Sequence, residues 1–268
     1  MTPDSSSPVL WRLDARGVAT LVFNRPAVNN AYDGEFIAGV LAGMDALGKE
    51  ATLRVVVLRG AGRHFQAGAD LKWIRALAAR SAEDNLRASR DTATVVRRLN
   101  ELPVPTVALV QGACFGGGTG IVAACDIVIA AEDAIFSIAE TRWGLVGGII
   151  LPQLADAIGV RQIRRYAQTG ERFDAHEARR IGLAHEVVAL AELETAGERV
   201  IDQLLRNAPI ANAQTKADAL ELARGAVSDE MFARLVEQHA AKRRSPEAVE
   251  GLASFAEKRP ASWYRTAT

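Results

Sequence analysis

The chain has 268 residues, a length that suits one large domain with a smaller extension. Apolar residues make up 49% of it and charged residues 24%, as is usual for a globular protein in water. Because 32 Lys and Arg balance 32 Asp and Glu, the net charge does not favour nucleic acid or an anionic membrane as a partner. Residues 1–8 are neither basic nor apolar, so we expect no targeting segment there and a cytoplasmic protein.

The first part of the chain predicts strands that alternate with helices. Residues 18–24 and 53–60 are apolar segments typical of strands. Residues 33–49 and 82–102 have apolar positions at helical spacing, and the second helix is expected to end before Pro103. Strands alternating with helices indicate an α/β fold.

Residues 106–112 predict a further strand, and the apolar stretch 113–131 approaches the length of a membrane span. Glycines and Asp126 interrupt this stretch, so we predict a buried helix followed by a strand at 126–131. Cys114 and Cys125 lie in these apolar surroundings, and we expect reduced thiols rather than a disulfide.

The last quarter of the chain predicts helices only, over residues 193–207, 210–224, 228–242 and 246–258. We therefore divide the chain into a core, residues 1–194, and a helical region, residues 195–268. Since no strand is predicted for this helical region to cover, we expect its apolar surface to meet another subunit.

Two glycine-rich turns stand out, each placed after a predicted strand and before a helix. The first is His-Phe-Gln-Ala-Gly-Ala-Asp at 64–70, and the second is Phe-Gly-Gly-Gly-Thr-Gly at 115–120. A backbone that turns at glycine into a helix leaves N–H groups without partners. Two such groups that converge on one point can stabilise an oxyanion. The turns therefore indicate chemistry on an acyl group.

Five segments in this order resemble the crotonase (enoyl-CoA hydratase/isomerase) superfamily: 21–26 with 30–31, 67–70, 116–118, 125–127 with 139–140, and 255–263. The resemblance runs from about residue 9 to residue 264. It implies a spiral of ββα units with two roughly perpendicular sheets, followed by a C-terminal all-helical region that assembles trimers or pairs of trimers. It also implies an acyl-CoA substrate and no further cofactor, because coenzyme A is part of the substrate.

The resemblance assigns an oxyanion hole to the backbone N–H groups of Ala69 and Gly117, and proton transfer to Glu140. The family's hydratases carry a second glutamate, which would fall at Gly120 of this chain. Glycine has no side chain, so water cannot be activated by two carboxylates in the usual form. We expect the space at Gly120 to accommodate a branched or carboxylated acyl group.

Further residues are expected to bind the substrate. The resemblance places coenzyme A on the loop at Arg25 and Ala27 and along the first turn, and lets the closing helix reach a neighbour's coenzyme A. Arg142 is a candidate to hold a distal carboxylate, and Trp73 and Trp143 are candidates to narrow the acyl pocket, although ion pairing and core packing are ordinary roles for such residues. The remaining candidates are Ala67, Gly68, Asp70, Gly116, Phe255 and Lys258. The histidines and cysteines lack metal-ligand spacing, so we expect no metal site.

The function that these features predict is hydration of an α,β-unsaturated acyl-CoA thioester. Residues 111–121 and 169–174 resemble hydratases of branched, glutaconyl-type thioesters most. An enoyl-CoA delta-isomerase that uses one glutamate as its proton shuttle is the nearest alternative. A non-catalytic homologue that binds acyl-CoA is a third possibility, which Gly120 keeps open and Glu140 disfavours.

Overall fold

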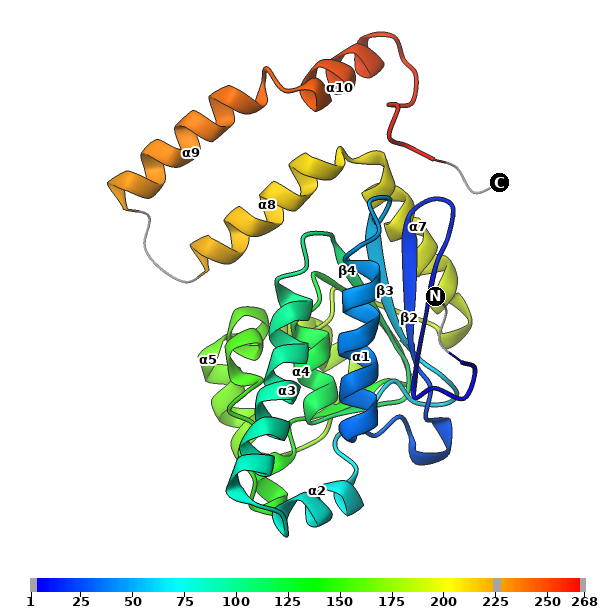
Figure 1. Cartoon of the computed structure of the whole chain (residues 1–268), viewed down its shortest axis with the longest axis vertical. Helices are drawn as coiled ribbons and strands as arrows, with labels where there is room; N and C mark the ends of the chain where they lie inside the picture. Colours follow the sequence, from blue (N-terminus) through cyan, green and yellow to red (C-terminus); the bar gives the residue numbers. More distant parts are fainter. Residues whose placement is uncertain (1–3, 224–227, 266–268) are drawn as a thin grey trace.

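A computed structural model describes residues 4–223 and 228–265 of the chain. Within these ranges the strands form two sheets (Figure 1). The larger sheet has the order β1 (Val9–Leu13), β2 (Val18–Phe23), β3 (Val55–Gly60), β4 (Thr106–Val110), β6 (Ile127–Ala131) and β9 (Glu186–Val188). The smaller sheet has the order β5 (Ala113–Phe115), β7 (Ile135–Ser137) and β8 (Phe173–Asp174). The α/β architecture predicted from the sequence is confirmed.

Helices surround the larger sheet and continue beyond it (Figure 1). The first half of the chain supplies α1 (Gly34–Leu47), α2 (Leu71–Ala78), α3 (Ala82–Asn100) and α4 (Gly117–Ala123). The second half supplies α5 (Leu151–Thr169), α6 (Ala175–Ile181), α7 (Leu193–Arg206), α8 (Pro209–Leu222), α9 (Asp229–Lys242) and α10 (Pro246–Ala256). Short 3₁₀ turns lie at η1 (Pro26–Val28), η2 (Glu140–Trp143) and η3 (Leu190–Glu192).

The central strands are buried on both faces, and their side chains alternate between two cores. Val56 and Leu58 of β3 belong to the larger core, which α1, α3, α4 and α5 cover. Val55 and Val57 point to the opposite face. Because β2, β3, β4 and β6 pair in parallel, the carboxyl ends of these strands meet at one edge of the sheet. Both glycine-rich turns follow these ends.

Helix α7 differs from the prediction for the C-terminal part of the chain. We expected every helix after residue 195 to lack a sheet to cover, but Leu193, Ile201 and Leu205 of α7 pack on the second face of the larger sheet. A Cβ atom on Gly197 would lie 2.9 Å from a methyl carbon of Leu109, so the helix lies very close to β4. The expectation was therefore wrong for α7, because the apolar face of this helix covers strands that come much earlier in the sequence.

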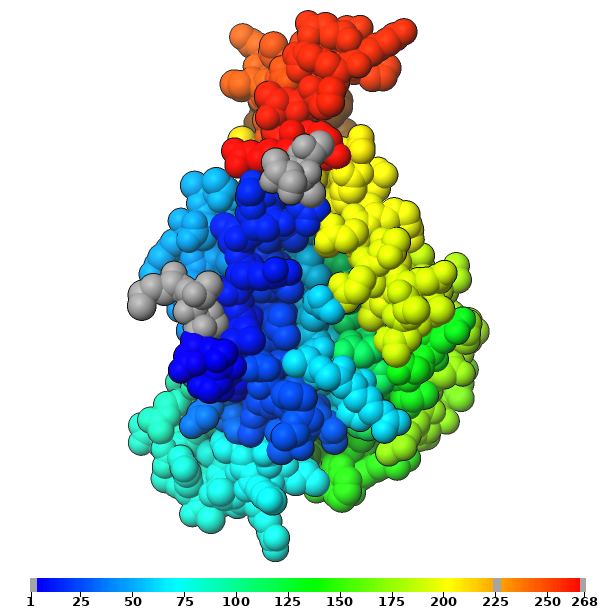
Figure 2. Space-filling view, turned by 90° about the vertical axis from the view of Figure 1, so that its right-hand side faces the viewer, coloured from blue at the N-terminus to red at the C-terminus, as the bar shows by residue number. Residues whose placement is uncertain are grey.

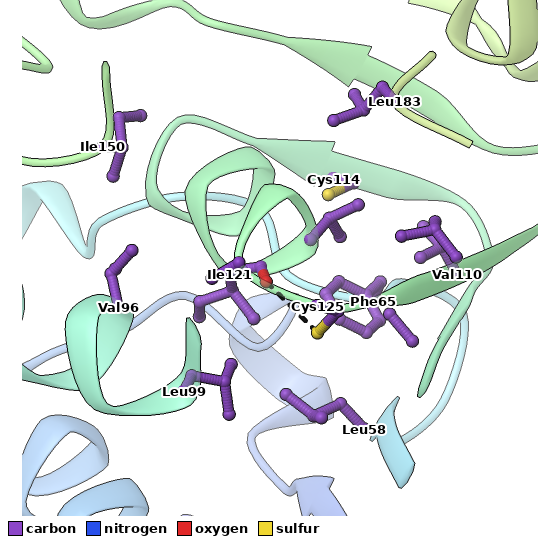
Figure 3. Close-up of a cluster of buried hydrophobic side chains, with 14 of the residues drawn as sticks. Leu58, Phe65, Val96, Leu99, Val110, Cys114, Ile121, Cys125, Ile150 and Leu183 are labelled. Carbon is purple, nitrogen blue, oxygen red and sulfur yellow. Dashed lines mark hydrogen bonds between the residues drawn. The ribbon is translucent and has the colours of Figure 1, made fainter. Parts of the chain in front are cut away.

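The apolar stretch 113–131 contains α4 and β6, the helix and the strand that its interrupted sequence predicted, and also β5, which was not predicted. Over the described residues no helix is long and apolar enough to cross a membrane. Cys114 and Cys125 are buried free thiols, and Cys125 donates a hydrogen bond to the carbonyl of Ile121 within the cluster in Figure 3. Burial raises the pKa of both thiols, which makes them inert core residues.

Helices α8, α9 and α10 extend from the core as an arm, whose outer part projects from one end of the molecule (Figures 1 and 2). Lys216 of α8 ties the arm to the core through an ion pair with Asp126, with 2.8 Å between Nζ and Oδ2. The chain then returns to the core, where the Arg54 guanidinium donates a hydrogen bond to the carbonyl of Trp263. The division at residue 195 stays a prediction, although α7 packs as part of the core.

Candidate active site

The first glycine-rich turn is held by hydrogen bonds on either side of Ala69. Gly68, with φ +89°, exchanges two hydrogen bonds of 3.0 Å with the buried Gln66 side chain. The Tyr32 N–H donates to the Gly68 carbonyl, and the Asp70 N–H donates to the Tyr32 carbonyl. Within residues 4–223 and 228–265, the Ala69 N–H between them has no hydrogen-bond partner. The turn therefore presents one fixed, free donor.

The second turn is held in the same way. Gly116 has φ +51° and donates its N–H to the Ser137 carbonyl, while its own carbonyl accepts from Thr119. Gly117 then begins α4, and its N–H has no partner among the described residues. This is a first-turn helix donor, and the helix dipole adds partial positive charge to it.

Glu140 lies at the start of η2, beside the second turn. A Cβ atom on Gly116 would be 3.1 Å from the Glu140 Oε1, and one on Gly147 would be 3.3 Å from the carboxyl carbon. Glycine at both positions lets the carboxyl group sit this close to the backbone. Its Oε2 is buried and has no hydrogen-bond partner among the described residues. Burial raises the pKa of Glu140, which suits a group that accepts and returns a proton.

Two hollows meet at Glu140. The turn hollow, of about 870 Å³, is lined by Ala67, Gly68, Ala69, Gly116 and Gly117 together with Arg142, Trp143 and Arg172. The apolar hollow, of about 940 Å³, is lined mainly by hydrophobic residues of α1, α2, α3 and the segment 145–150. Tyr32, Ile74, Gly117, Glu140 and Leu145 border both hollows. Ala69, Gly117 and Glu140 therefore line the same turn hollow, and Gly117 and Glu140 also line the adjoining apolar hollow.

Some of the site residues that the sequence predicted line the two hollows, and the others lie outside them. The structure brings together Ala67, Gly68, Ala69, Gly116, Gly117 and Glu140, with Arg142 and Trp143 on the same hollow. Of the two hollows Trp73 borders the apolar one, whereas Trp143 is 63% exposed and borders the turn hollow. The Arg142 side chain lies over Gly170, where a Cβ atom would come within 2.8 Å of its Nε.

Arg25 and Asp70 support the first turn rather than lining either hollow. Arg25 pairs with Asp33 at 2.7 Å and with Asp70 at 3.6 Å, and also donates to the Ala31 carbonyl. The Asp70 carboxylate accepts from the N–H of Lys72, so it caps α2. Ala27 is exposed in η1 and borders neither hollow.

The structure corrects the expectation for Gly120. We expected the missing side chain to leave room for the substrate, but Gly120 is buried and faces Ile150, which belongs to the apolar cluster drawn in Figure 3. A Cβ atom on Gly120 would lie 2.6 Å from the Ile150 Cβ and still closer to its Cγ2. Ile150, only 2% exposed, fills the space that a second acid would need.

Phe255 and Lys258 lie on or just after α10, at the far end of the arm, and border neither hollow. Phe255 is 85% exposed. Within one chain these two residues do not join the site.

Tyr32 is the site residue that the sequence analysis missed. It follows Asn30 and Ala31 in a segment we matched to the family, but its backbone pairing with Ala69 arises from the tertiary fold. An aromatic residue just before a helix N-cap carries no sequence signal for such a role.

Comparison with known proteins agrees with this geometry. The family model described as enoyl-CoA hydratase/isomerase matches residues 14–266. The chain is 32% identical to a Δ(3,5)-Δ(2,4)-dienoyl-CoA isomerase of Dictyostelium discoideum, over 93% of this chain and 88% of that one. It is also 32% identical to a hydroxycinnamoyl-CoA hydratase-lyase of Pseudomonas fluorescens, over 72% and 71% of the two chains.

Among solved structures, an enoyl-CoA hydratase from Shewanella pealeana superimposes with a TM-score of 0.91 at 35% identity, over 96% of each chain. This likeness confirms the crotonase fold predicted from the sequence. Because the family model spans nearly the whole chain and the relatives share at least 30% identity, the protein is an enzyme of the enoyl-CoA hydratase/isomerase family.

Proposed function

We propose that the enzyme adds water across the C2=C3 double bond of an α,β-unsaturated acyl-CoA thioester. The observation that carries this proposal is the buried, unpartnered Oε2 of Glu140, a residue that lines the same hollow as Ala69 and Gly117, whose N–H groups are free. A buried polar atom without a partner calls for a ligand or water to satisfy it.

Each group then has a defined task. Glu140 accepts a proton from water while the water oxygen bonds to C3. The π electrons move towards the thioester carbonyl, and the resulting enolate oxygen accepts hydrogen bonds from Ala69 and Gly117. Glu140 then returns the proton to C2, which completes the addition. A fixed donor of this kind typically contributes about a hundred- to a thousand-fold in rate.

For the acyl group we propose a hydrocarbon chain in preference to a glutaconyl-type one. Of the described residues that border the apolar hollow, none is Lys, Arg or His, and Glu140 is the only acid. A second carboxylate placed there would be desolvated without a cation and would face a like charge. Arg142, the candidate partner for such a carboxylate, borders the turn hollow instead.

A delta-isomerase remains the second candidate, and one observation favours it. Ile150 fills the space beside Gly120, so a single carboxylate serves the reaction. One carboxylate suffices to carry a proton from C2 to C4.

Mass spectrometry of purified protein incubated with trans-2-enoyl-CoAs of four to twelve carbons tests the proposal. Hydration adds the mass of one water, whereas isomerisation leaves the mass unchanged. In the Glu140→Gln variant we expect activity to fall by about 10² to 10⁴ while acyl-CoA binding persists. Glu50→Gln, at an exposed position just after α1, is the matched control. Near-normal turnover of Glu140→Gln would remove Glu140 from the mechanism.

We also propose that the arm, α8 to α10, assembles a trimer or a pair of trimers. In such an assembly Phe255 and Lys258 would contact the coenzyme A bound by a neighbouring subunit. Their position on the arm, away from the hollows of their own chain, supports this role. Arg25 and Ala27, on the loop beside the first turn, remain proposed contacts for coenzyme A. The cytoplasmic location remains a prediction from the sequence.

A further inference from the structure

We propose that the Tyr32 hydroxyl holds the water that adds to the substrate, in the place of a second carboxylate. This inference rests on the hydratase function proposed above. It assigns a positioning role to a side chain that the family resemblance did not nominate.

Tyr32 is fixed between the two glycine-rich turns. Its N–H donates to the Gly68 carbonyl at 2.9 Å, and its carbonyl accepts from Asp70 at 2.8 Å. A Cβ atom on Gly117 would lie 2.6 Å from the Tyr32 Cε1, so the ring lies directly against the second turn. The Trp73 ring contacts it edge-on, with 5.9 Å between the ring centroids. The ring thus has little freedom to move.

The hydroxyl has no structural role that would explain its presence. Among residues 4–223 and 228–265 it makes no hydrogen bond, although the ring borders both hollows. Burial, with the nearby Glu140 charge as a second cause, raises the pKa of Tyr32 to about 12. The phenol therefore stays neutral at physiological pH and keeps a lone pair that accepts a hydrogen bond.

Glu140 and Tyr32 flank the place where water must act. The Glu140 carboxyl group occupies the space beside Gly116 where a side chain would lie, and the Tyr32 ring does the same beside Gly117, the next residue of the same turn. A water between them donates one hydrogen to the Glu140 carboxylate and the other to the phenol oxygen. Its lone pair then points to C3 of the substrate. The proton on Glu140 moves on to C2, and the phenol gains and loses none.

The packing at Gly120 explains why a different group is needed for the second hydrogen of the water. Ile150 leaves no space for a side chain at Gly120, so a carboxylate from α4 cannot reach the water. Without a second acceptor, the water would rotate about its bond to Glu140. A reacting group that is misplaced by about 1 Å can lose on the order of a hundred-fold in rate.

Two reactions of the same site separate this role from a structural one. Hydration of trans-2-hexenoyl-CoA needs a positioned water, whereas exchange of the C2 hydrogen of hexanoyl-CoA in D₂O needs only Glu140 and the two N–H groups. For Tyr32→Phe, which keeps the ring, we expect kcat for hydration to fall by about a hundred-fold. We expect KM, the melting temperature and the exchange rate to stay close to native values.

Tyr264→Phe is the matched control, because it deletes the same atom from a tyrosine whose hydroxyl binds Asp202, away from both hollows. Equal loss of hydration and exchange in Tyr32→Phe, or no loss of either, would overturn the positioning role alone. Absence of hydration by the native enzyme across the enoyl-CoA panel would instead overturn the proposed function, and the role of Tyr32 with it.

Discussion

Glu140 combines two properties that oppose each other in a stable protein. Its carboxyl group is largely removed from water, yet Oε2 has no hydrogen-bond partner among the described residues. Burial disfavours the charged form, so ionisation of Glu140 weakens the folded state. This loss of stability accompanies the function, because the buried position of Glu140 places a proton acceptor in the hollow that Ala69 and Gly117 also line.

This cost predicts how stability depends on pH. The pKa of Glu140 is raised in the folded state, so the folded protein keeps the proton at pH values where the unfolded chain has lost it. The free energy of unfolding therefore falls as pH rises from the unfolded pKa through the folded one. Glutamine has no proton to lose, so Glu140→Gln should gain melting temperature relative to native protein as pH rises, then level off.

Melting curves of both proteins at several pH values measure this difference, and Glu50→Gln, at an exposed position outside the arm, controls for loss of a charge. A Glu140→Gln protein that loses stability relative to native as pH rises would contradict the predicted sign.

The contact between Gly120 and Ile150 yields a second prediction at this scale. Gly120→Glu alone should destabilise the protein by about 1–3 kcal/mol or more, because the new side chain overlaps Ile150 in a packed core. Adding Ile150→Ala removes Cγ2, the closest of the overlapping atoms, while Cβ stays, and should restore part of the stability. Thermal unfolding of the two single variants and the double variant measures the coupling. Additive effects would show that the two positions do not share this space.

At the scale of elements, local rules predicted the turns well. Gly68 and Gly116 adopt positive φ values that favour glycine, so the two turns could be read directly from the sequence. The strands at 18–24 and 106–112 and the helices at 33–49 and 82–102 were also predicted close to their observed bounds. In each case the pattern of neighbouring residues determines the structure.

The elements and contacts that we did not predict depend on segments that are distant in the sequence. Neither α5 nor the three short strands of the smaller sheet was predicted, and α7 was not matched to the sheet. Ile150 meets Gly120, and Tyr32 meets Gly117, only because the fold brings these segments together. Such pairs have no signature at a fixed spacing, so reading one sequence cannot find them.

From the residues that line the apolar hollow we predict which acyl groups the enzyme accepts. Residues of α1, α2 and α3 supply hydrocarbon contacts, and the Thr92 hydroxyl among them already donates to the Ala88 carbonyl. Two thioesters of similar size make the test: trans-2-hexenoyl-CoA, which ends in a methyl group, and glutaconyl-CoA, which ends in a carboxylate. We expect kcat/KM to favour hexenoyl-CoA by at least about a hundred-fold, because an unpaired charge is costly to bury.

A preference for glutaconyl-CoA would show instead that the hollow rearranges to bring a cation to the acyl group. Arg142, on the adjoining turn hollow, would then be the first residue to replace. Its removal should abolish that preference and leave hexenoyl-CoA hydration in place.

At the scale of the whole molecule, the arm is the part that one chain does not explain. Figures 1 and 2 show α9 and α10 projecting from the core. Several of their apolar residues are uncovered: Phe232 is 63% exposed, and Leu252 and Phe255 are 68% and 85% exposed. Such side chains on one projecting arm suit burial against another subunit.

We therefore expect a trimer or a multiple of it in solution, and we expect charge on α10 to weaken it. The paired substitution Leu252→Glu and Phe255→Glu places two carboxylates on the surface proposed to be buried, where desolvation opposes association. Light scattering at micromolar concentration should then report smaller particles than for native protein. Val160→Glu, at an exposed apolar position on α5, is the matched control. If the native chain is a monomer, the arm has another purpose, and Lys258 cannot reach a neighbour's coenzyme A.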